Sequence, residues 1–306
     1  MGKKFSGVSQ TMSRFRGWIQ AGATLLTNLH LPNFLKGGLY QGAGKTVCVP
    51  GLNCYSCPAA SGACPIGAFQ AVVGSSKFSF SYYITGFLIL LGVLLGRFIC
   101  GFLCPFGWFQ ELLHKIPTKK LSTKKLKPLR YLKYAVLLVM VFLLPAFLVN
   151  DVGMGDPFFC KYLCPQGVLE GAIPLSLTNS GIRAALGSLF TWKFSLLLAV
   201  IVLSIVFYRP FCKWLCPLGA FYALFNRVSL FQMKVDKNKC VSCGKCAKAC
   251  KMDVDVTKTP NHTECIRCGM CIRACPTNAV SFRYGFGDGK KEPVKPADKL
   301  KTEETK

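Results

Sequence analysis

The sequence predicts a mainly α-helical membrane domain followed by a small α+β domain, and three observations support this prediction. First, 51% of the 306 residues are hydrophobic although the formal net charge is +25. Second, several apolar stretches approach the roughly 20 residues that a membrane-spanning helix needs. Third, the chain has 18 cysteines, and they fall mostly into short-spaced groups, eight of them in a polar C-terminal segment. A soluble globular domain rarely combines these properties.

Four stretches are expected to cross the membrane, at about residues 17–35, 78–96, 132–149 and 190–208. The first is the least apolar, because it contains Gln20, Asn28 and His30. Residues 168–186 are also apolar, but Pro174 and an Asn-Ser-Gly turn interrupt them. Since proline breaks a helix interior, this segment is expected to lie at the interface or to be re-entrant.

The distribution of basic residues predicts the orientation. The loop over residues 97–133 carries nine Lys or Arg residues, whereas the loops over 36–77 and 150–188 carry three and two. The basic loop is therefore expected at the cytoplasmic face of the cell (inner) membrane, and both termini of this multi-pass protein should be cytoplasmic. Residues 1–16 are polar and basic, so no cleavable signal peptide is expected. The basic loop could also steer an acidic partner.

A repeated cysteine motif follows the spans. Cys-x3-Cys-Pro-x-Gly, or its second half, occurs four times, with cysteines at Cys64, at Cys100 and Cys104, at Cys160 and Cys164, and at Cys212 and Cys216. The order of span, motif, span and motif occurs twice. This pattern predicts two tandem repeats of a two-span unit, related by an axis along the membrane normal.

The predicted topology places two of these motifs just inside the cytoplasmic face. Four thiolates there, from Cys100, Cys104, Cys212 and Cys216, would hold one tetranuclear iron–sulfur cluster. Iron prefers such soft ligands, and free amides in a Cys-Pro-x-Gly turn can donate hydrogen bonds to sulfur. An arginine, Arg97 or Arg209, precedes each motif by three residues. These arginines either neutralise the cluster or simply mark the end of a span.

The other two motifs should lie at the outer face, where Cys64, Cys160 and Cys164 need a fourth ligand for a second membrane cluster. Cys57 is favoured because Cys57-Pro58 resembles the other Cys-Pro units. Cys54 is the alternative, and Cys48 is less favoured. A disulfide among Cys48, Cys54 and Cys57 is a rival interpretation, because the outer face can be oxidising.

The last eight cysteines have the Cys-x2-Cys-x2-Cys-x3-Cys spacing twice, which is typical of two-cluster ferredoxins. In such domains the fourth cysteine of each run ligates the other cluster. The spacing therefore predicts one group of Cys240, Cys243, Cys246 and Cys275, and a second group of Cys265, Cys268, Cys271 and Cys250. The expected domains are a membrane domain over 1–232, a ferredoxin-like α+β domain over 233–284 and a disordered tail over 285–306.

The paired Cys-x3-Cys-Pro motifs followed by the twin ferredoxin runs resemble the NapH/NosR/CcoG-type membrane polyferredoxins, over about residues 97–276. The resemblance implies a multi-pass inner-membrane protein that is associated with quinol oxidation or that delivers electrons to a respiratory or maturation partner. The cysteine-rich outer loop, Cys48 to Cys57, departs from that pattern. Cysteines on the outer side suggest instead that electrons cross the membrane.

We therefore expect an iron–sulfur electron-transfer protein that connects a cytoplasmic donor or acceptor with the membrane or the outer face. A quinol dehydrogenase subunit and an iron–sulfur assembly or redox-sensing scaffold are the alternatives. The expected cofactors are four [4Fe-4S] clusters, with quinone as a candidate further carrier. The expected partners are membrane lipid and a redox protein such as ferredoxin, flavodoxin or a reductase subunit. Nucleic-acid binding is not expected, because the topology accounts for the positive charge.

Overall fold

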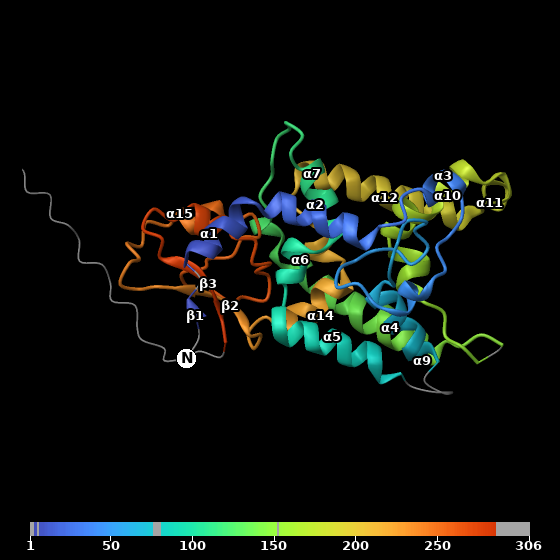
Figure 1. Cartoon of the computed structure of the whole chain (residues 1–306), viewed down its shortest axis with the longest axis horizontal. Helices are drawn as coiled ribbons and strands as arrows, with labels where there is room; N and C mark the ends of the chain where they lie inside the picture. Colours follow the sequence, from blue (N-terminus) through green and yellow to red (C-terminus); the bar gives the residue numbers. More distant parts are fainter. Residues whose placement is uncertain (1–2, 5, 76–80, 152, 286–306) are drawn as a thin grey trace, which may run out of the picture.

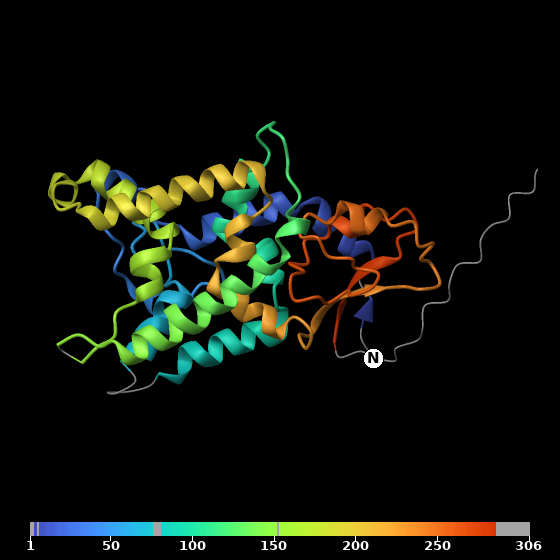
Figure 2. The same ribbon diagram turned by 180° about the vertical axis from the view of Figure 1, so that it is seen from behind.

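The computed structural model describes residues 3–4, 6–75, 81–151 and 153–285. The disordered tail expected over 285–306 lies outside the described residues except for Gly285. A helix bundle forms most of the elongated molecule, and a small domain that contains a sheet lies at one end of it (Figure 1). The view from behind shows the same separation of the two parts (Figure 2).

Short helices joined by turns and loops make up the first part of the chain, and the first of them packs against the small domain. They are α1 (Ser6–Arg14), α2 (Arg16–Thr27), α3 (Asn33–Lys36), the 3-10 helix η1 (Ala43–Thr46), α4 (Pro65–Gly74), α5 (Tyr82–Leu95), α6 (Phe98–Phe102) and α7 (Pro105–Leu113). The loop between η1 and α4 runs between the helices instead of around them (Figure 1).

The second half of the bundle contains the longer helices. They begin with the 3-10 helix η2 (Thr123–Tyr131), α8 (Leu132–Val136), the π-helix η3 (Leu137–Leu143) and α9 (Leu144–Phe147), which follow one another without a break. The rest are the π-helices η4 (Phe159–Leu163) and η5 (Gly167–Ala172), then α10 (Ile173–Thr178), α11 (Ser180–Ala184), α12 (Ser188–Val206), α13 (Pro210–Trp214) and α14 (Pro217–Phe225).

Two of these helical stretches, among the described residues, are long and apolar enough to cross a membrane: 126–147 and α12. They coincide with the third and fourth predicted spans. Helix α5 lies within the second predicted span and is apolar but shorter. Residues 76–80, which include the start of that span, lie outside the described residues.

The first predicted span, residues 17–35, is not one continuous helix. Helix α2 ends at Thr27, and the Asn28 side chain donates a hydrogen bond to the Thr24 carbonyl at 3.0 Å. An asparagine side chain that bonds to the backbone competes with the next helical turn. Pro32 then precedes α3, and the helical direction is lost between the two elements.

The Cys-Pro motifs begin helices. Cys64, Cys104 and Cys216 are the extended N-cap residues of α4, α7 and α14, and a proline occupies the first helical position each time. Proline suits this position because its missing N–H would have no partner inside the helix. The motif therefore places a thiol at the amino end of a helix, where backbone amides are unpaired.

The small domain contains a three-stranded antiparallel sheet in the order β1-β3-β2 together with α15 (Lys245–Ala249) and α16 (Met270–Arg273). Strand β2 (Phe231–Val235) pairs with β3 (Val280–Tyr284) along its whole length. The other edge of β3 pairs with β1 (Lys3–Lys4), and the Phe282 amide donates to the Ser9 hydroxyl at 3.0 Å. The N-terminal segment thus packs with the small domain, which differs from the predicted boundary of 1–232 for the membrane domain. Because β1 and β3 lie at opposite ends of the chain, no local sequence pattern predicts that they pair.

Buried ion pairs attach the small domain to the bundle. The Glu264 carboxylate accepts a hydrogen bond from Arg97 at 3.0 Å and also pairs with Lys133. The side chains of Arg97 and Lys133 are both 0% exposed. Asp253 pairs with Lys213 at 3.3 Å and with Arg130 at 3.4 Å. Part of the predicted basic loop therefore neutralises carboxylates of the small domain.

Candidate iron–sulfur centres

The eight cysteines of the small domain line two separate cavities. Cys240, Cys243, Cys246 and Cys275 line one of them, and Cys250, Cys265, Cys268 and Cys271 line the other. These are the groups that the spacing predicts, with the fourth cysteine of each run facing the cavity of the other run. We call them the distal group and the proximal group.

The two loops that carry these cysteines have equivalent backbones. Gly244 and Gly269 have φ angles of 70° and 79° directly before α15 and α16. Glycine adopts this left-handed conformation without strain. Ser242 and Arg267, two residues earlier, also have positive φ. The matched turns give each run of cysteines the same course around its cavity.

Four buried thiols meet in the bundle. The side chains of Cys100, Cys104, Cys212 and Cys216 interact electrostatically with one another, and we call them the inner group. The Gly219 amide donates to the Cys216 sulfur at 3.3 Å, as expected at the amino end of a helix. Among the described residues, no His, Cys, Asp or Glu side chains converge tightly enough for a single metal ion. Four thiols spread around one centre suit a cluster of several irons better.

A second set of thiols meets on the far side of the bundle from the small domain. Cys160 interacts electrostatically with Cys164, Cys64 and Cys54, and Cys54 interacts with Cys164 and Cys64. We call Cys54, Cys64, Cys160 and Cys164 the outer group. All eighteen cysteines have free thiols, so the rival disulfide in the outer loop is not formed.

Cys57, the residue favoured as fourth outer ligand, is not brought to this group. Its sulfur faces Asn28 Oδ1 at 3.5 Å, and its charged neighbours are Glu170 and Lys45. Cys54 lies there instead, and its sulfur would lie 3.7 Å from a Cβ on Gly167 of the Cys164 motif. The Glu170 carboxylate accepts from the Cys54 amide at 2.9 Å and holds that turn in place. The spacing of the cysteines carried no signal for this contact.

Two glutamines bind the two halves of the bundle together at the cysteines. Gln110 Nε2 lies 3.1 Å from the Cys212 sulfur, and its Oε1 accepts from the Phe211 amide at 3.2 Å. Gln70 makes the same contacts, with Nε2 3.2 Å from the Cys160 sulfur and Oε1 2.9 Å from the Phe159 amide. Each glutamine thus fixes the first cysteine of a motif in the other half.

Sequence reasoning missed these glutamines, although the motif contains a signal for them. In each of the four Cys-Pro-x-Gly motifs, the cysteine before the proline is followed six residues later by a side chain with a polar group: Gln70, Gln110, Glu170 and Tyr222. All four make hydrogen bonds near a cysteine motif or the loop between η1 and α4. Six residues is less than two helical turns, so the side chain still reaches the region around the helix start.

The arginines of the motifs are fully buried and cross between the halves. Arg97 Nη2 donates to the Cys212 carbonyl at 3.3 Å, and Arg209 Nη1 donates to the Cys100 carbonyl. A Cβ on Gly107 would lie 2.8 Å from Arg209 Nη1. The glycine of this motif therefore leaves room for the arginine of the other half.

Each arginine shares a single carboxylate with a second cation. Arg209 and Arg16 share Glu111, as Arg97 and Lys133 share Glu264. Burial raises the pKa of Glu111, but Arg209 and Arg16 outweigh this effect and lower the pKa to about 2. Both sets therefore carry a net positive charge in a buried place. The Nε of Arg97 and the Nη2 of Arg209 have no hydrogen-bond partner among the described residues. An anionic four-thiolate cluster would fit both the charge and the free donors.

The proximal and inner groups meet at a backbone contact. A Cβ on Gly101, which follows Cys100, would lie 2.3 Å from the Ile266 carbonyl oxygen and 3.8 Å from the Cys268 Cα. The absence of a side chain at Gly101 lets the two cysteine loops touch. Arg16 Nε and Gln20 Nε2 both donate to the Gly101 carbonyl, at 2.9 and 3.0 Å.

The inner and outer groups meet at the loop between η1 and α4. A Cβ on Gly51 would lie 2.8 Å from the Cys104 Cα. The backbone of Leu52 contacts the Cys104 thiol, and that of the next residue, Asn53, contacts the Cys64 thiol. A single peptide unit therefore lies between a cysteine of each group.

Tyr222 lies beside the same junction. Its side chain is 0% exposed, and its hydroxyl donates to the Pro50 carbonyl at 3.1 Å. It interacts electrostatically with Cys100 and Cys104 of the inner group and with Cys64 of the outer group. The four cysteine groups thus form one series: distal, proximal, inner and outer.

Replacing Gln110 by Leu is expected to lower the reduction potential of the inner centre by about 20–60 mV. A hydrogen bond to sulfur stabilises the reduced, more negative state, and one such bond contributes about 0.5–1.5 kcal/mol. Gln70→Leu is the matched control, which should shift the outer centre instead. EPR-monitored redox titration of both variants checks the expectation. Identical titrations of the two variants and the wild type would contradict it.

Comparison with known proteins agrees with the chemistry of these thiols. A sequence profile of a 4Fe-4S binding domain matches residues 62–82, 79–124, 133–173 and 189–238. Another 4Fe-4S binding domain profile matches residues 233–254 and 259–281. Every cysteine of the four groups except Cys54 lies in one of these segments. No solved structure matches the chain.

Three curated relatives illustrate the similarity. MJ0750 of Methanocaldococcus jannaschii is 34% identical over 65% of this chain and 77% of its own length. The methylamine utilization ferredoxin-type protein MauN of Paracoccus denitrificans is 28% identical over 61% of this chain and 56% of its own length. The regulatory protein NosR of Stutzerimonas stutzeri is 28% identical over 52% of this chain, a stretch that covers 21% of NosR.

Proposed function

Because the chain belongs to the NosR-type family of 4Fe-4S binding proteins, we propose that it carries electrons across a membrane along its four cysteine groups. Each group would hold one [4Fe-4S] cluster, which supplies one-electron redox chemistry when bound. The distal and proximal groups are the tail sites, and the inner and outer groups are the membrane sites. The continuous series of contacts from group to group supports this proposal.

The proposed membrane arrangement has four crossings built from two tandem repeats. The two arginine contacts are reciprocal, because Arg97 of the first half donates to the Cys212 carbonyl and Arg209 of the second half donates to the Cys100 carbonyl. This reciprocity supports a duplicated unit. Both termini are proposed to be cytoplasmic. Strand β1 pairs with β3 of the small domain, so the N-terminal segment and the small domain lie on the same side. The nine basic residues of the 97–133 loop favour the cytoplasm for that side.

The protein's own residues would shorten the path between neighbouring centres. Gly101 permits backbone contact between the proximal and inner groups. Leu52, Asn53 and Tyr222 fill the space between the inner and outer groups with covalent and hydrogen-bonded structure. Clusters confined to the two surfaces would be separated by about 30 Å of hydrocarbon. The loop between η1 and α4 avoids that gap because it brings Cys54 and Asn53 into the bundle.

The distal group offers the entry or exit point for a soluble partner. Cys243 is exposed, and the exposed cations Lys239, Lys245 and Lys248 lie within five residues of it in the sequence. A positive rim favours an acidic redox protein, because opposite charges raise the rate of encounter. We therefore propose a small acidic carrier such as ferredoxin or flavodoxin as the partner, with a reductase subunit as the alternative.

The observation that carries the proposal is the junction at Leu52 and Asn53, where two consecutive residues contact one cysteine of the inner group and one of the outer group. Proteoliposomes that contain trapped ferricyanide test it directly. Titanium(III) citrate added outside should bleach the ferricyanide when the small domain faces outward, because electrons can pass through the protein. Protein-free liposomes give the background rate.

The double variant Cys160→Ser/Cys164→Ser provides the control for the route. This variant should keep the clusters of the small domain. It should nevertheless reduce the trapped ferricyanide no faster than protein-free liposomes do. Wild-type protein that reduces an acceptor on the outside but never the trapped ferricyanide would contradict transmembrane transfer. The chain would then be a carrier on one face only.

Quinone as a further carrier stays a prediction. The two side chains considered for it in the first predicted span have other contacts: Gln20 donates to Gly101, and the His30 ring stacks on Tyr40 with centroids 3.7 Å apart. No feature of the described residues favours the quinol dehydrogenase or the scaffold over electron transfer across the bundle.

Iron counting distinguishes the two candidates for the fourth outer ligand. Cys54→Ser should lower the iron content from about 16 to about 12 atoms per chain, because one tetranuclear cluster loses a ligand. Cys57→Ser is the matched control, three residues away in the same loop, and should keep all the iron. A loss of four irons in Cys57→Ser with none in Cys54→Ser would reverse the assignment.

A further inference from the structure

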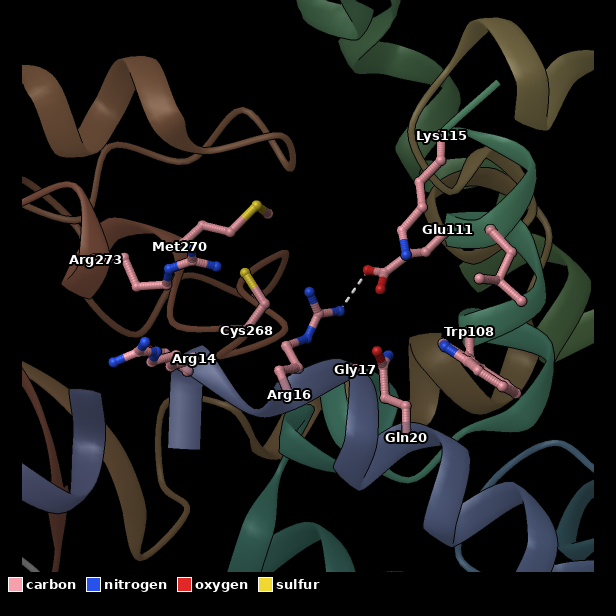
Figure 3. A pocket seen from close by; sticks show the side chains of 12 residues that line it. Arg14, Arg16, Gly17, Gln20, Trp108, Glu111, Lys115, Cys268, Met270 and Arg273 are labelled. Atoms are coloured by element: carbon pink, nitrogen blue, oxygen red, sulfur yellow. Dashed lines mark hydrogen bonds and ion pairs between the residues drawn. The ribbon is translucent and has the colours of Figure 1, made fainter. Parts of the chain in front are cut away.

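A cavity of about 190 Å³ lies between the helix bundle and the small domain. Residues of α1, α2, α7 and α16 line it (Figure 3). The thiol of Cys268, from the proximal group, is part of its wall. The volume corresponds to about six waters at the roughly 30 Å³ that each occupies in the liquid. Pockets for drug-sized ligands measure about 300–1,000 Å³, so this one suits a small polar group.

The side chains around this cavity are mainly cationic. Arg14, Arg16, Lys115 and Arg273 line it, and Glu111 is the only carboxylate in its wall among the described residues. Arg16 is paired with Glu111 (Figure 3), and Glu111 also pairs with Arg209. The carboxylate is therefore already shared by two guanidinium groups and has no negative charge to spare.

The other three cations have no counter-charge. Among the described residues, no hydrogen bond or ion pair is made by the side chains of Arg14, Lys115 or Arg273. Arg14 and Arg273 end α1 and α16, and the carboxyl end of a helix favours a cation. That preference explains each residue type alone. It does not explain why cations from three separate segments line one cavity. Figure 3 shows Lys115 and Arg273 on opposite sides of the cavity, whereas the Arg14 side chain is turned away from its centre.

Exposed apolar side chains lie next to the cavity. Trp18 is 79% exposed and follows the lining residue Gly17, while Leu112 lines the cavity and is 40% exposed. Phe15, between the two lining arginines of α1 and α2, is 49% exposed. Exposed tryptophan is typical of the level of the lipid head groups. In the membrane orientation proposed above, the cavity opens at the level of the lipid phosphate groups.

We propose that this cavity binds a phosphate group through Arg14, Lys115 and Arg273. The group belongs either to an anionic phospholipid at the membrane surface or to a soluble phosphate. Arginine and lysine are the usual ligands of phosphate, because charge-assisted hydrogen bonds to its oxygens are strong. A phosphate bound here would lie beside Cys268 and disfavour reduction of a cluster in the proximal group. The site itself does not depend on the proposed electron route.

Two pairs of substitutions test the site. Lys115→Gln/Arg273→Gln removes two charges from the cavity. Lys119→Gln/Arg183→Gln removes the same charges from exposed positions elsewhere. Equilibrium dialysis with radiolabelled inorganic phosphate, on full-length protein in a neutral detergent, measures the soluble ligand. Native mass spectrometry after reconstitution with phosphatidylglycerol or phosphatidylcholine measures retained lipid. Equal iron contents of all proteins show that both variants are folded.

The expected result is that wild-type protein and the control pair bind alike, and that the cavity pair binds roughly tenfold or more weakly. The loss of even one charge-assisted hydrogen bond accounts for such a factor. Weakened phosphate binding supports the soluble source, and selective loss of phosphatidylglycerol supports the lipid source. If neither ligand binds the cavity pair differently from the control pair, the proposal is overturned. Failure of the ferricyanide experiment would leave this result unaffected.

Discussion

The double variant Cys212→Ser/Cys216→Ser is expected to lose four of about 16 irons and all transfer of electrons to trapped ferricyanide. These two thiols are half of the inner group, which lies between the proximal and outer groups. Without them the remaining path would have to cross the bundle from Cys268 to Cys64 in one step. The EPR signals of the distal and proximal centres should persist, because their eight ligands all lie in the small domain.

The matched control for this variant is Cys48→Ser. Cys48 is also a buried thiol of the bundle, but it belongs to none of the four groups. This variant should keep its iron and its rate of ferricyanide reduction. The role of the inner group would be refuted if Cys212→Ser/Cys216→Ser retained the wild-type transfer rate. Loss of the tail signals in the same variant would instead indicate general unfolding.

The substitution Glu264→Gln is expected to lower the free energy of unfolding by about 3–5 kcal/mol. It leaves Arg97 and Lys133, both fully buried, without their carboxylate. Burial raises the pKa of Glu264, but Arg97 and Lys133 outweigh this effect and lower the pKa to about 2. The carboxylate is therefore charged and stabilising at neutral pH, and this contribution is lost progressively as the pH falls from the ordinary pKa of 4.5 to about 2. Chemical denaturation of the detergent-solubilised protein, followed by tryptophan fluorescence, measures the change.

Asp156→Asn provides the comparison on the surface. Asp156 pairs with Lys161 at 2.5 Å, and the two side chains are 40% and 39% exposed. An exposed ion pair contributes about 0–1 kcal/mol, because water screens both charges. If Glu264→Gln and Asp156→Asn destabilise the protein equally, Glu264 does not hold the small domain on the bundle.

The sequence alone determined the chemistry of the cysteines and their local geometry. Spacing predicted the two groups of the small domain, and the structure brings together the same eight residues. The Cys-Pro motifs also determined their own conformation, because proline at the first helical position and an extended cysteine before it are local preferences. The helices over 126–147 and 188–206 follow from apolar composition, which is likewise a local property.

Tertiary structure decided which thiol of the outer loop lies beside Cys64, Cys160 and Cys164. Cys54 and Cys57 lie in the same loop, and Cys57 even precedes a proline as the other motif cysteines do. Glu170 accepts a hydrogen bond from the Cys54 amide from a segment 116 residues away, so this contact fixes the Cys54 turn. Tertiary structure likewise decided that the first predicted span ends as a helix before Asn28. The polar residues in that span are visible in the sequence, but they do not by themselves predict where the helix ends.

Tertiary structure also decided how the cysteine groups follow one another. The eighteen cysteines revealed an electron carrier, but not that Gly101 would touch the Cys268 loop or that Leu52 and Asn53 would join two groups. These contacts link residues far apart in the chain, and their partners are backbone atoms that no side-chain pattern specifies. The sequence therefore determined which atoms can bind iron, whereas packing between distant segments determined that they form one series.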